Sequence, residues 1–235
     1  MEIKFQNCII SIHNSWNEFF TDEILQILKN IEDSIGDDFT PNAENIFRVL
    51  NNDLSRLKCC ILGQDPYPQP GVATGRAFEV SGVNSWQDKK INFSLKNMLR
   101  LLHKNYMHME FVSSIKNVRE DIENNKFPVL TPDKIFVHWE RQGVLLLNTS
   151  LTCRTGSSNS HAELWPEFTS QLVQFITEKN NNVKWLLWGR DAQRFAECIA
   201  DDRKYKSFHP RLNGTGPGSF FYENHFLKID SINWA

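Results

Sequence analysis

Asp65 occupies a position in this sequence that is suited to chemistry. It lies in Gly63-Gln64-Asp65-Pro66-Tyr67-Pro68, directly after the apolar run Cys59-Cys60-Ile61-Leu62. An apolar run ending in such a turn is typical of a buried strand that delivers a carboxylate to the sheet edge where ligands bind. Pro66 restricts the backbone and so fixes the direction of the carboxylate. Asp65 could act as a general base on water or stabilise a positive charge; the alternative is a helix cap or a solvated loop residue.

Three further polar turns follow candidate strand segments, namely Asn148-Thr149-Ser150, Gly189-Arg190-Asp191 and His209-Pro210-Arg211. If the segments are parallel strands, all four turns meet at one edge of the sheet and surround a single cleft. The Asn148 carboxamide could read a heterocycle that presents a donor beside an acceptor, as uracil does, or simply bond to its own turn. His209 could donate to a developing anion, or have a structural or surface role.

Two aromatic residues are further candidates. Phe78 could provide a platform for a base, although most phenylalanines are core residues. Tyr67 could form the wall of a pocket, or pack only against the turn that Pro66 makes.

The elements that must position these residues alternate between strands and helices. Apolar runs predict strands at 58–62, 144–148 and 183–188, and the segment 204–208 is a fourth strand candidate. Helical patterns predict a first helix that is capped by Asn14-Ser15 and contains Phe19, Phe20, Ile24, Leu25 and Leu28. Ser94 is the expected cap of a helix at 95–103, and Pro166 lies in the first turn of a helix at 167–179. A further helix is predicted at 191–200. The polar segment 105–133 is expected to be an excursion from the main fold. The predicted fold is α/β, with a central, mostly parallel four-stranded sheet flanked by helices.

The composition limits the class of protein. A length of 235 residues with 40% hydrophobic content predicts one domain that spans residues 1–235. The net charge of −2 argues against coating a polyanion but allows a local basic face. Five cysteines without C-x-x-C spacing argue against zinc or iron–sulfur sites and favour a reducing compartment. Because no apolar run could span a bilayer and no signal-peptide pattern is visible, we expect a cytoplasmic protein without a membrane partner; a nuclear or viral setting stays open.

Taken together, the motifs resemble those of uracil-DNA glycosylases of the family 1 type, over nearly the whole chain. The turn at Asp65 looks like the water-activating motif of that family. The segment from Gly143 through Asn148 to Asn159-Ser160-His161 resembles its uracil-recognition segment. The remaining similar segments are Leu186-Leu187-Trp188-Gly189, His209-Pro210 at the start of the DNA-intercalation loop, and Phe220-Phe221 with Asn224-His225-Phe226.

The resemblance implies a DNA repair hydrolase that flips deoxyuridine out of DNA and cleaves its N-glycosidic bond, which leaves free uracil and an abasic site. Asp65 would orient water and stabilise the sugar cation, and His209 would stabilise the departing uracil anion. Uracil contacts are implied for Gln64, Tyr67, Phe78 and Asn148. DNA contacts are implied for Ser94, Gly189, Arg190, Pro210, Arg211 and Leu212. The reaction requires no metal and no other cofactor. The implied partner is uracil-containing DNA, single- or double-stranded, and a protein inhibitor is a further candidate partner. We expect the protein to be a monomer.

The chain departs from the family in the residues that grip DNA. The family has serine where Arg190 and Arg211 stand, and histidine at the position of Pro68. The loop after His209 is one residue longer, so either Leu212 or Asn213 takes the place of the intercalating leucine. These differences predict that phosphate clamping depends on charge. The alternative functions are a glycosylase for another base and a catalytically weakened DNA-binding or replication-accessory protein on the same fold.

Overall fold

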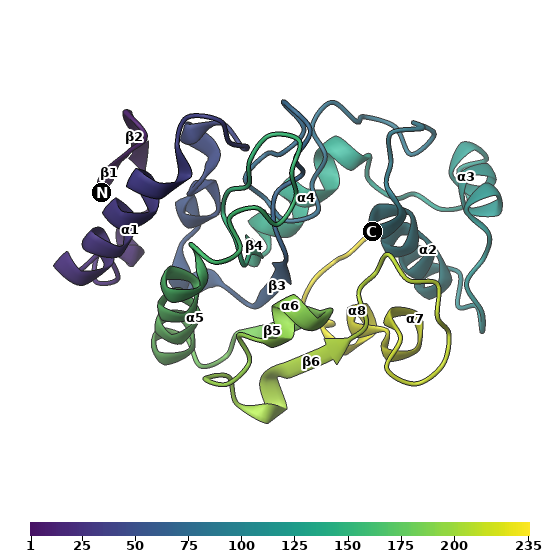
Figure 1. Ribbon diagram of the computed structural model, residues 1–235. Coiled ribbons are helices and arrows are strands. Elements are labelled where there is room, and N and C mark those ends of the chain that lie inside the picture. Colours follow the sequence, from purple (N-terminus) through teal and green to yellow (C-terminus); the bar gives the residue numbers. More distant parts are fainter.

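The computed structural model describes residues 1–235 and is built around a four-stranded sheet (Figure 1). The strands, in order across the sheet, are β4 (Val144–Asn148), β3 (Cys59–Gly63), β5 (Lys184–Trp188) and β6 (Lys204–Ser207). Every neighbouring pair is parallel, and each strand lies within one residue of its predicted position. The predicted α/β fold with a parallel four-stranded sheet is therefore confirmed.

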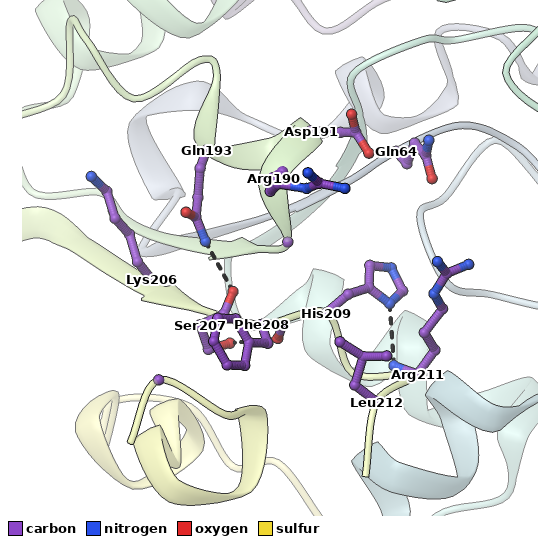
Figure 2. Close-up of a pocket in the computed structure, with 12 residues that line it drawn as sticks. Gln64, Arg190, Asp191, Gln193, Lys206, Ser207, Phe208, His209, Arg211 and Leu212 are labelled. Carbon is purple, nitrogen blue, oxygen red and sulfur yellow. Dashed lines mark hydrogen bonds between the residues drawn. The ribbon is translucent and has the colours of Figure 1, made fainter. Parts of the chain in front are cut away.

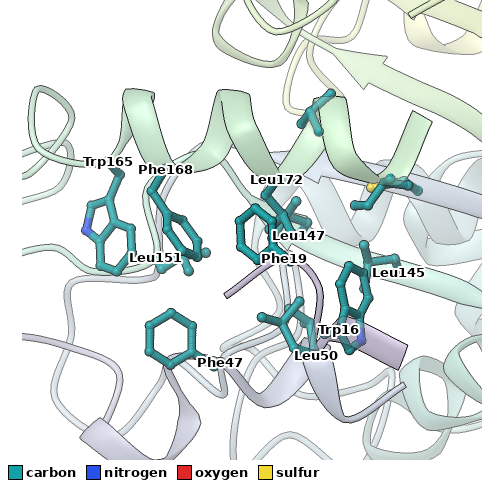
Figure 3. Packing of buried hydrophobic residues seen from close by; sticks show 14 of the residues in the cluster. Trp16, Phe19, Phe47, Leu50, Leu145, Leu147, Leu151, Trp165, Phe168 and Leu172 are labelled. Atoms are coloured by element: carbon teal, nitrogen blue, oxygen red, sulfur yellow. The ribbon is translucent and has the colours of Figure 1, made fainter. Parts of the chain in front are cut away.

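The central strands are buried on both faces. In β3, Cys60 and Leu62 belong to one hydrophobic cluster, whereas Cys59 and Ile61 belong to a second cluster on the opposite face. Figure 3 shows part of the first cluster, with Phe168 and Leu172 of a covering helix above the strand residue Leu147. A parallel strand with two covered faces has an uninterrupted apolar sequence, which is why these strands could be located from the sequence.

Helices cover each face. The first cluster is covered by α1 (Asp22–Ile35) and α5 (Pro166–Lys179), beside a hairpin of β1 (Glu2–Phe5) and β2 (Cys8–Ser11). The second is covered by α2 (Phe93–Tyr106), α4 (Pro132–Arg141), α7 (Phe220–Glu223) and α8 (His225–Lys228). The remaining helices are α3 (Ile115–Glu123), α6 (Arg190–Gln193) and 3-10 helices at Asn14–Trp16, Ala43–Asn45, Arg48–Asn51, Leu54–Arg56 and Asp201–Arg203. None of the helices has the length and apolar character needed to cross a membrane.

The first predicted helix begins later than expected. Asn14–Trp16 is only a 3-10 helix, and α1 begins at Asp22 after Thr21, whose side chain accepts a hydrogen bond from the Ile24 N–H. Phe19 and Phe20 are buried before the helix starts. The prediction of a cap at Asn14-Ser15 was wrong, because two suitable cap sites lie seven residues apart and core packing selects the later one.

Two other helix boundaries also differ from the prediction. Asn92, rather than Ser94, caps α2, because its Oδ1 accepts a hydrogen bond from the Leu95 N–H at 3.0 Å. The helix predicted at 191–200 ends at Gln193. Beyond it the chain continues in turns that bury Ala196 and Ile199 in the first cluster. The predicted cap and the predicted length of these helices were therefore wrong.

The segment 105–133 contains regular structure. It includes the end of α2, the whole of α3 and the start of α4. The His103 Nε2 atom lies 2.9 Å from the Asp121 carboxylate, which connects α2 to α3. The sequence of the segment is polar because α3 lies on the outside of the molecule and buries only Val118.

Candidate active site

The carboxyl ends of the four strands meet at one edge of the sheet, as the sequence predicts. Gly63 pairs with Asn148, and Trp188 pairs with Ser207. A cavity of about 170 Å³ lies at this edge. Its lining includes all six residues that were predicted to be catalytic or to contact the base, namely Gln64, Asp65, Tyr67, Phe78, Asn148 and His209.

Asp65 is held by a residue far away in the chain. The Asn159 N–H donates a hydrogen bond to the Asp65 carboxylate, and the Asn159 Oδ1 accepts one from the Gln64 side chain at 3.2 Å. Asn159 has a φ of 62°, a left-handed conformation that asparagine tolerates better than most residues. Burial raises the pKa of Asp65, and the nearby Asp191 raises it further, whereas the Asn159 hydrogen bond opposes the rise. The half-buried carboxylate thus has a fixed direction and a raised pKa.

Backbone contacts fix the turn that carries Asp65. The Gln64 carbonyl accepts hydrogen bonds from the Ser150 N–H at 2.9 Å and from the Thr149 hydroxyl at 2.7 Å. The Pro68 carbonyl accepts one from the Gly156 N–H at 2.8 Å. The two turns that follow β3 and β4 therefore form one rigid unit.

Asn148 has an unused carboxamide. The residue is only 6% exposed, and its side chain forms no hydrogen bond with the rest of the protein, so the alternative in which it bonds to its own turn does not occur. The side chain lies against Gly63, where a Cβ atom would collide with the Asn148 Oδ1. A buried polar group normally has a partner. The carboxamide is therefore available to a ligand in the cavity.

Phe78 and Tyr67 form aromatic walls of the cavity. Phe78 has a φ of 67°, and its ring centroid lies 5.7 Å from that of Trp188 and 6.0 Å from that of His209. The Tyr67 hydroxyl donates to the Phe78 carbonyl at 3.2 Å and accepts from the Asn92 side chain at 2.8 Å. Burial raises the pKa of Tyr67 to about 12. The Tyr67 ring is thereby held in one position, by a contact to Asn92 that the sequence did not predict.

His209 is neutral and has a defined tautomer. Burial, assisted by the charge of Arg211 and opposed by that of Asp191, lowers the pKa of His209 to about 4. Its Nδ1 accepts a hydrogen bond from the Arg211 N–H at 3.1 Å (Figure 2). The ring proton therefore lies on Nε2. Gly189, at a φ of 95°, leaves room for the ring, since a Cβ there would lie 3.2 Å from the His209 Cβ. His209 can thus act as an uncharged hydrogen-bond donor.

A second and larger cavity, of about 470 Å³, adjoins the first and shares Gln64 and His209 with it (Figure 2). Of the six residues predicted to contact DNA, Gly189, Arg190, Arg211 and Leu212 line this cavity, and Ser94 lines the smaller one. Pro210 is buried and lines neither; its carbonyl accepts a hydrogen bond from Asn97 at 2.6 Å. No three side chains of His, Cys, Asp or Glu are grouped so that they could hold a metal ion.

The sequence of the chain is similar to known proteins whose activity fits this site geometry. Residues 52–228 match the model of the uracil DNA glycosylase superfamily. The chain belongs to this superfamily. It is 31% identical to uracil-DNA glycosylase 2 of Listeria innocua, over 96% of this chain and 98% of that protein. It is also 31% identical to the uracil-DNA glycosylase of Bacillus cereus, over 94% and 91% of the two chains.

Solved structures of the superfamily share the fold. The uracil-DNA glycosylase of mimivirus has a TM-score of 0.70 at 22% identity, over 93% of this chain and 82% of that chain. The enzyme of Nitratifractor salsuginis has a TM-score of 0.72 at 19% identity, over 94% of this chain and 92% of that chain.

Proposed function

We propose that the protein is a uracil-DNA glycosylase of the family 1 type, a hydrolase that removes uracil from DNA in base excision repair. The observation that carries the proposal is the free carboxamide of Asn148, which lies in one cavity with Phe78, Asp65 and His209. These residues provide a carboxamide that can form hydrogen bonds with the edge of a base, an aromatic ring for stacking, a carboxylate and a neutral hydrogen-bond donor, all around a cavity for one pyrimidine. The superfamily membership supports the same activity.

Asn148 and Phe78 select the base. The Asn148 Oδ1 accepts from uracil N3–H and the amide N–H donates to O4, whereas cytosine presents the reverse pattern. Phe78 stacks on the ring. Tyr67 excludes thymine, because its fixed ring occupies the space that a 5-methyl group needs. A flipped deoxyuridine is therefore recognised by both its edge and its size.

Asp65 and His209 assist bond cleavage. The C1′–N1 bond breaks, its electron pair leaves with the uracil as an anion, and the oxygen of water bonds to C1′. Asp65 orients this water, accepts a proton from it and stabilises the cationic sugar. The Nε2–H of His209 donates to the uracil O2, where negative charge develops, and a neutral imidazole does this without transferring its proton.

The remaining features support the proposed substrate and setting. Arg190 and Arg211 clamp phosphates of single- or double-stranded DNA, and Leu212, which is exposed, fills the space in the base stack that the flipped nucleotide leaves.

Five free cysteines favour action in a reducing compartment, the cytoplasm. Two solved mimivirus variants are in complex with UGI. We extend this to a protein inhibitor of the present chain, which equimolar UGI in the excision assay would test.

Uracil release from a labelled oligonucleotide with one deoxyuridine tests the proposed function, with wild type beside Asp65→Asn and with chelator present throughout. We expect wild type to release uracil and Asp65→Asn to be at least about 100-fold slower, while DNA binding is retained. If wild type binds DNA but releases no uracil, the protein is instead a DNA-binding or replication-accessory protein on the same fold.

A further inference from the structure

The larger cavity contains residues that the proposed function does not use, chiefly Phe208 and Lys206. We propose that this cavity binds the nucleotide adjacent to the flipped deoxyuridine on the same strand, with its base stacked on Phe208 and its phosphate beside the surrounding cations. The proposal rests on the proposed function, because it concerns a second part of the same DNA substrate.

Phe208 is an exposed aromatic ring on a rigid backbone. It is 56% exposed, although it lies between the buried Ser207 and the catalytic candidate His209. Its N–H donates to the Gly218 carbonyl at 2.7 Å, and its ring covers Gly218, where an added Cβ would lie 3.5 Å from the ring. The ring also borders the cavity below Arg190, as Figure 2 shows. An exposed aromatic ring on an anchored backbone is a surface on which any base can stack.

Three cations border the same cavity, namely Arg190, Lys206 and Arg211. None of them forms an ion pair or a side-chain hydrogen bond within the protein. Asp191 is the one acidic residue in the lining, and its carboxylate forms an ion pair with Arg194 at 3.8 Å. Unpaired cations around an exposed aromatic ring are the combination with which proteins hold unstacked nucleotides and their phosphates.

The position of the cavity identifies the nucleotide. Because both cavities are lined by Gln64 and His209, a residue bound in the larger one is a direct neighbour of the residue bound in the smaller one. A base paired within a duplex is already stacked on its neighbours. The contact with Phe208 is therefore gained mainly on single-stranded substrate.

The test compares Phe208→Ala with Phe208→Trp and with Phe93→Ala, a control at another exposed phenylalanine (67%) that lines neither cavity. The substrates are single-stranded and duplex oligonucleotides with one deoxyuridine. We expect Phe208→Ala to raise KM for the single strand about 5- to 100-fold, with kcat within about twofold of wild type and little change on duplex. Phe208→Trp and Phe93→Ala should keep the wild-type KM.

A second measurement changes the DNA substrate and compares wild type with Phe208→Ala. Replacing one neighbour of the deoxyuridine by an abasic spacer should raise the KM of wild type on one side only, and this loss should vanish in Phe208→Ala. An unchanged KM in Phe208→Ala, or an equal spacer effect in both proteins, would overturn the adjacent-nucleotide site while uracil release by wild type upheld the proposed function. Absence of release by wild type would overturn both.

Discussion

Burial keeps the imidazole of His209 neutral, and a backbone contact decides where its single proton lies. An ordinary histidine is half protonated at a pH of about 6.5. Here burial lowers the pKa to about 4, so the ring is neutral near pH 7. The Arg211 N–H occupies Nδ1, so the single proton lies on Nε2.

Replacing this donor gives a prediction for catalysis. We expect His209→Leu to lower kcat about 30- to 1000-fold, because a positioned donor to a developing anion contributes about 2–4 kcal/mol. His209→Asn, which retains an N–H donor, should lose less. Single-turnover uracil release provides the measurement, and a His209→Leu protein of near-normal rate would remove His209 from the site.

The sequence located the residues at strand ends but not those that hold them in place. Asp65, Asn148 and His209 could be predicted because each lies at the end of a segment that the sequence indicates as a strand. Asn159 contacts Asp65 across 94 positions of sequence, and Asn92 contacts Tyr67 across 25. Neither contact has a local pattern, since an asparagine in a loop has the same neighbours whether or not it positions a distant side chain.

Helices and strands differ in how well their limits follow from sequence. A strand buried on both faces stops where its apolar run stops, so β3, β4 and β5 could be placed closely. The edge strand β6 is only partly buried and has a mixed sequence. A helix can begin at any of several cap residues, and the choice between Asn92 and Ser94 depends on a tertiary contact. Asn92 caps α2 and also holds Tyr67, which favours the earlier start.

This shared use of Asn92 gives a prediction at the level of the helix. We expect Asn92→Ala to lower the free energy of unfolding by about 1 kcal/mol, through loss of the α2 cap. It should also raise thymine release about tenfold or more, because Tyr67 loses its support. Thr21→Ala removes the cap of α1, far from the site, and should show the stability loss alone.

Urea unfolding and thymine release from a thymidine-containing oligonucleotide measure the two effects separately. Tyr67→Ala serves as the positive control for thymine release. If Asn92→Ala excludes thymine as well as wild type does, Tyr67 is positioned by its other contacts.

The whole molecule carries a net charge of −2, so attraction to DNA must come from a local surface. We expect Arg190→Ser with Arg211→Ser to make the slope of log K against log salt shallower by about 1 to 2, since each phosphate contact contributes about 0.9. The matched control is Arg56→Ser with Arg141→Ser, which removes the same charge near Gly143, at the other end of the strands. Equal slopes for the two double variants would mean that Arg190 and Arg211 are merely solvated.

The stability of the molecule should depend on pH through His225. This residue is 2% exposed, its Nδ1 accepts a hydrogen bond from Trp188 at 3.0 Å, and burial lowers its pKa to about 4. Because the unfolded chain takes up a proton near pH 6.5 and the folded chain does not, stability falls as the pH drops from about 6.5 toward 4.

We expect this residue alone to lower the free energy of unfolding by about 2 kcal/mol between pH 6.5 and 4.5. His225→Gln keeps an acceptor for Trp188 but cannot titrate, so its stability should fall less over the same interval. Urea unfolding of both proteins at the two pH values measures the difference, and parallel losses would assign the pH dependence to other groups.

The hydrogen bond between the Phe208 N–H and the Gly218 carbonyl closes the loop after β6 at its neck. His209 lies just inside the neck, whereas residues 213–217 are exposed beyond it, with Asn213 contacting Arg100. Residues 213–217 can therefore change in number and type during evolution while the His209 imidazole keeps its position relative to the sheet. Changes beyond the neck can thus alter DNA binding during evolution while the position of the catalytic histidine, and with it uracil excision, is conserved.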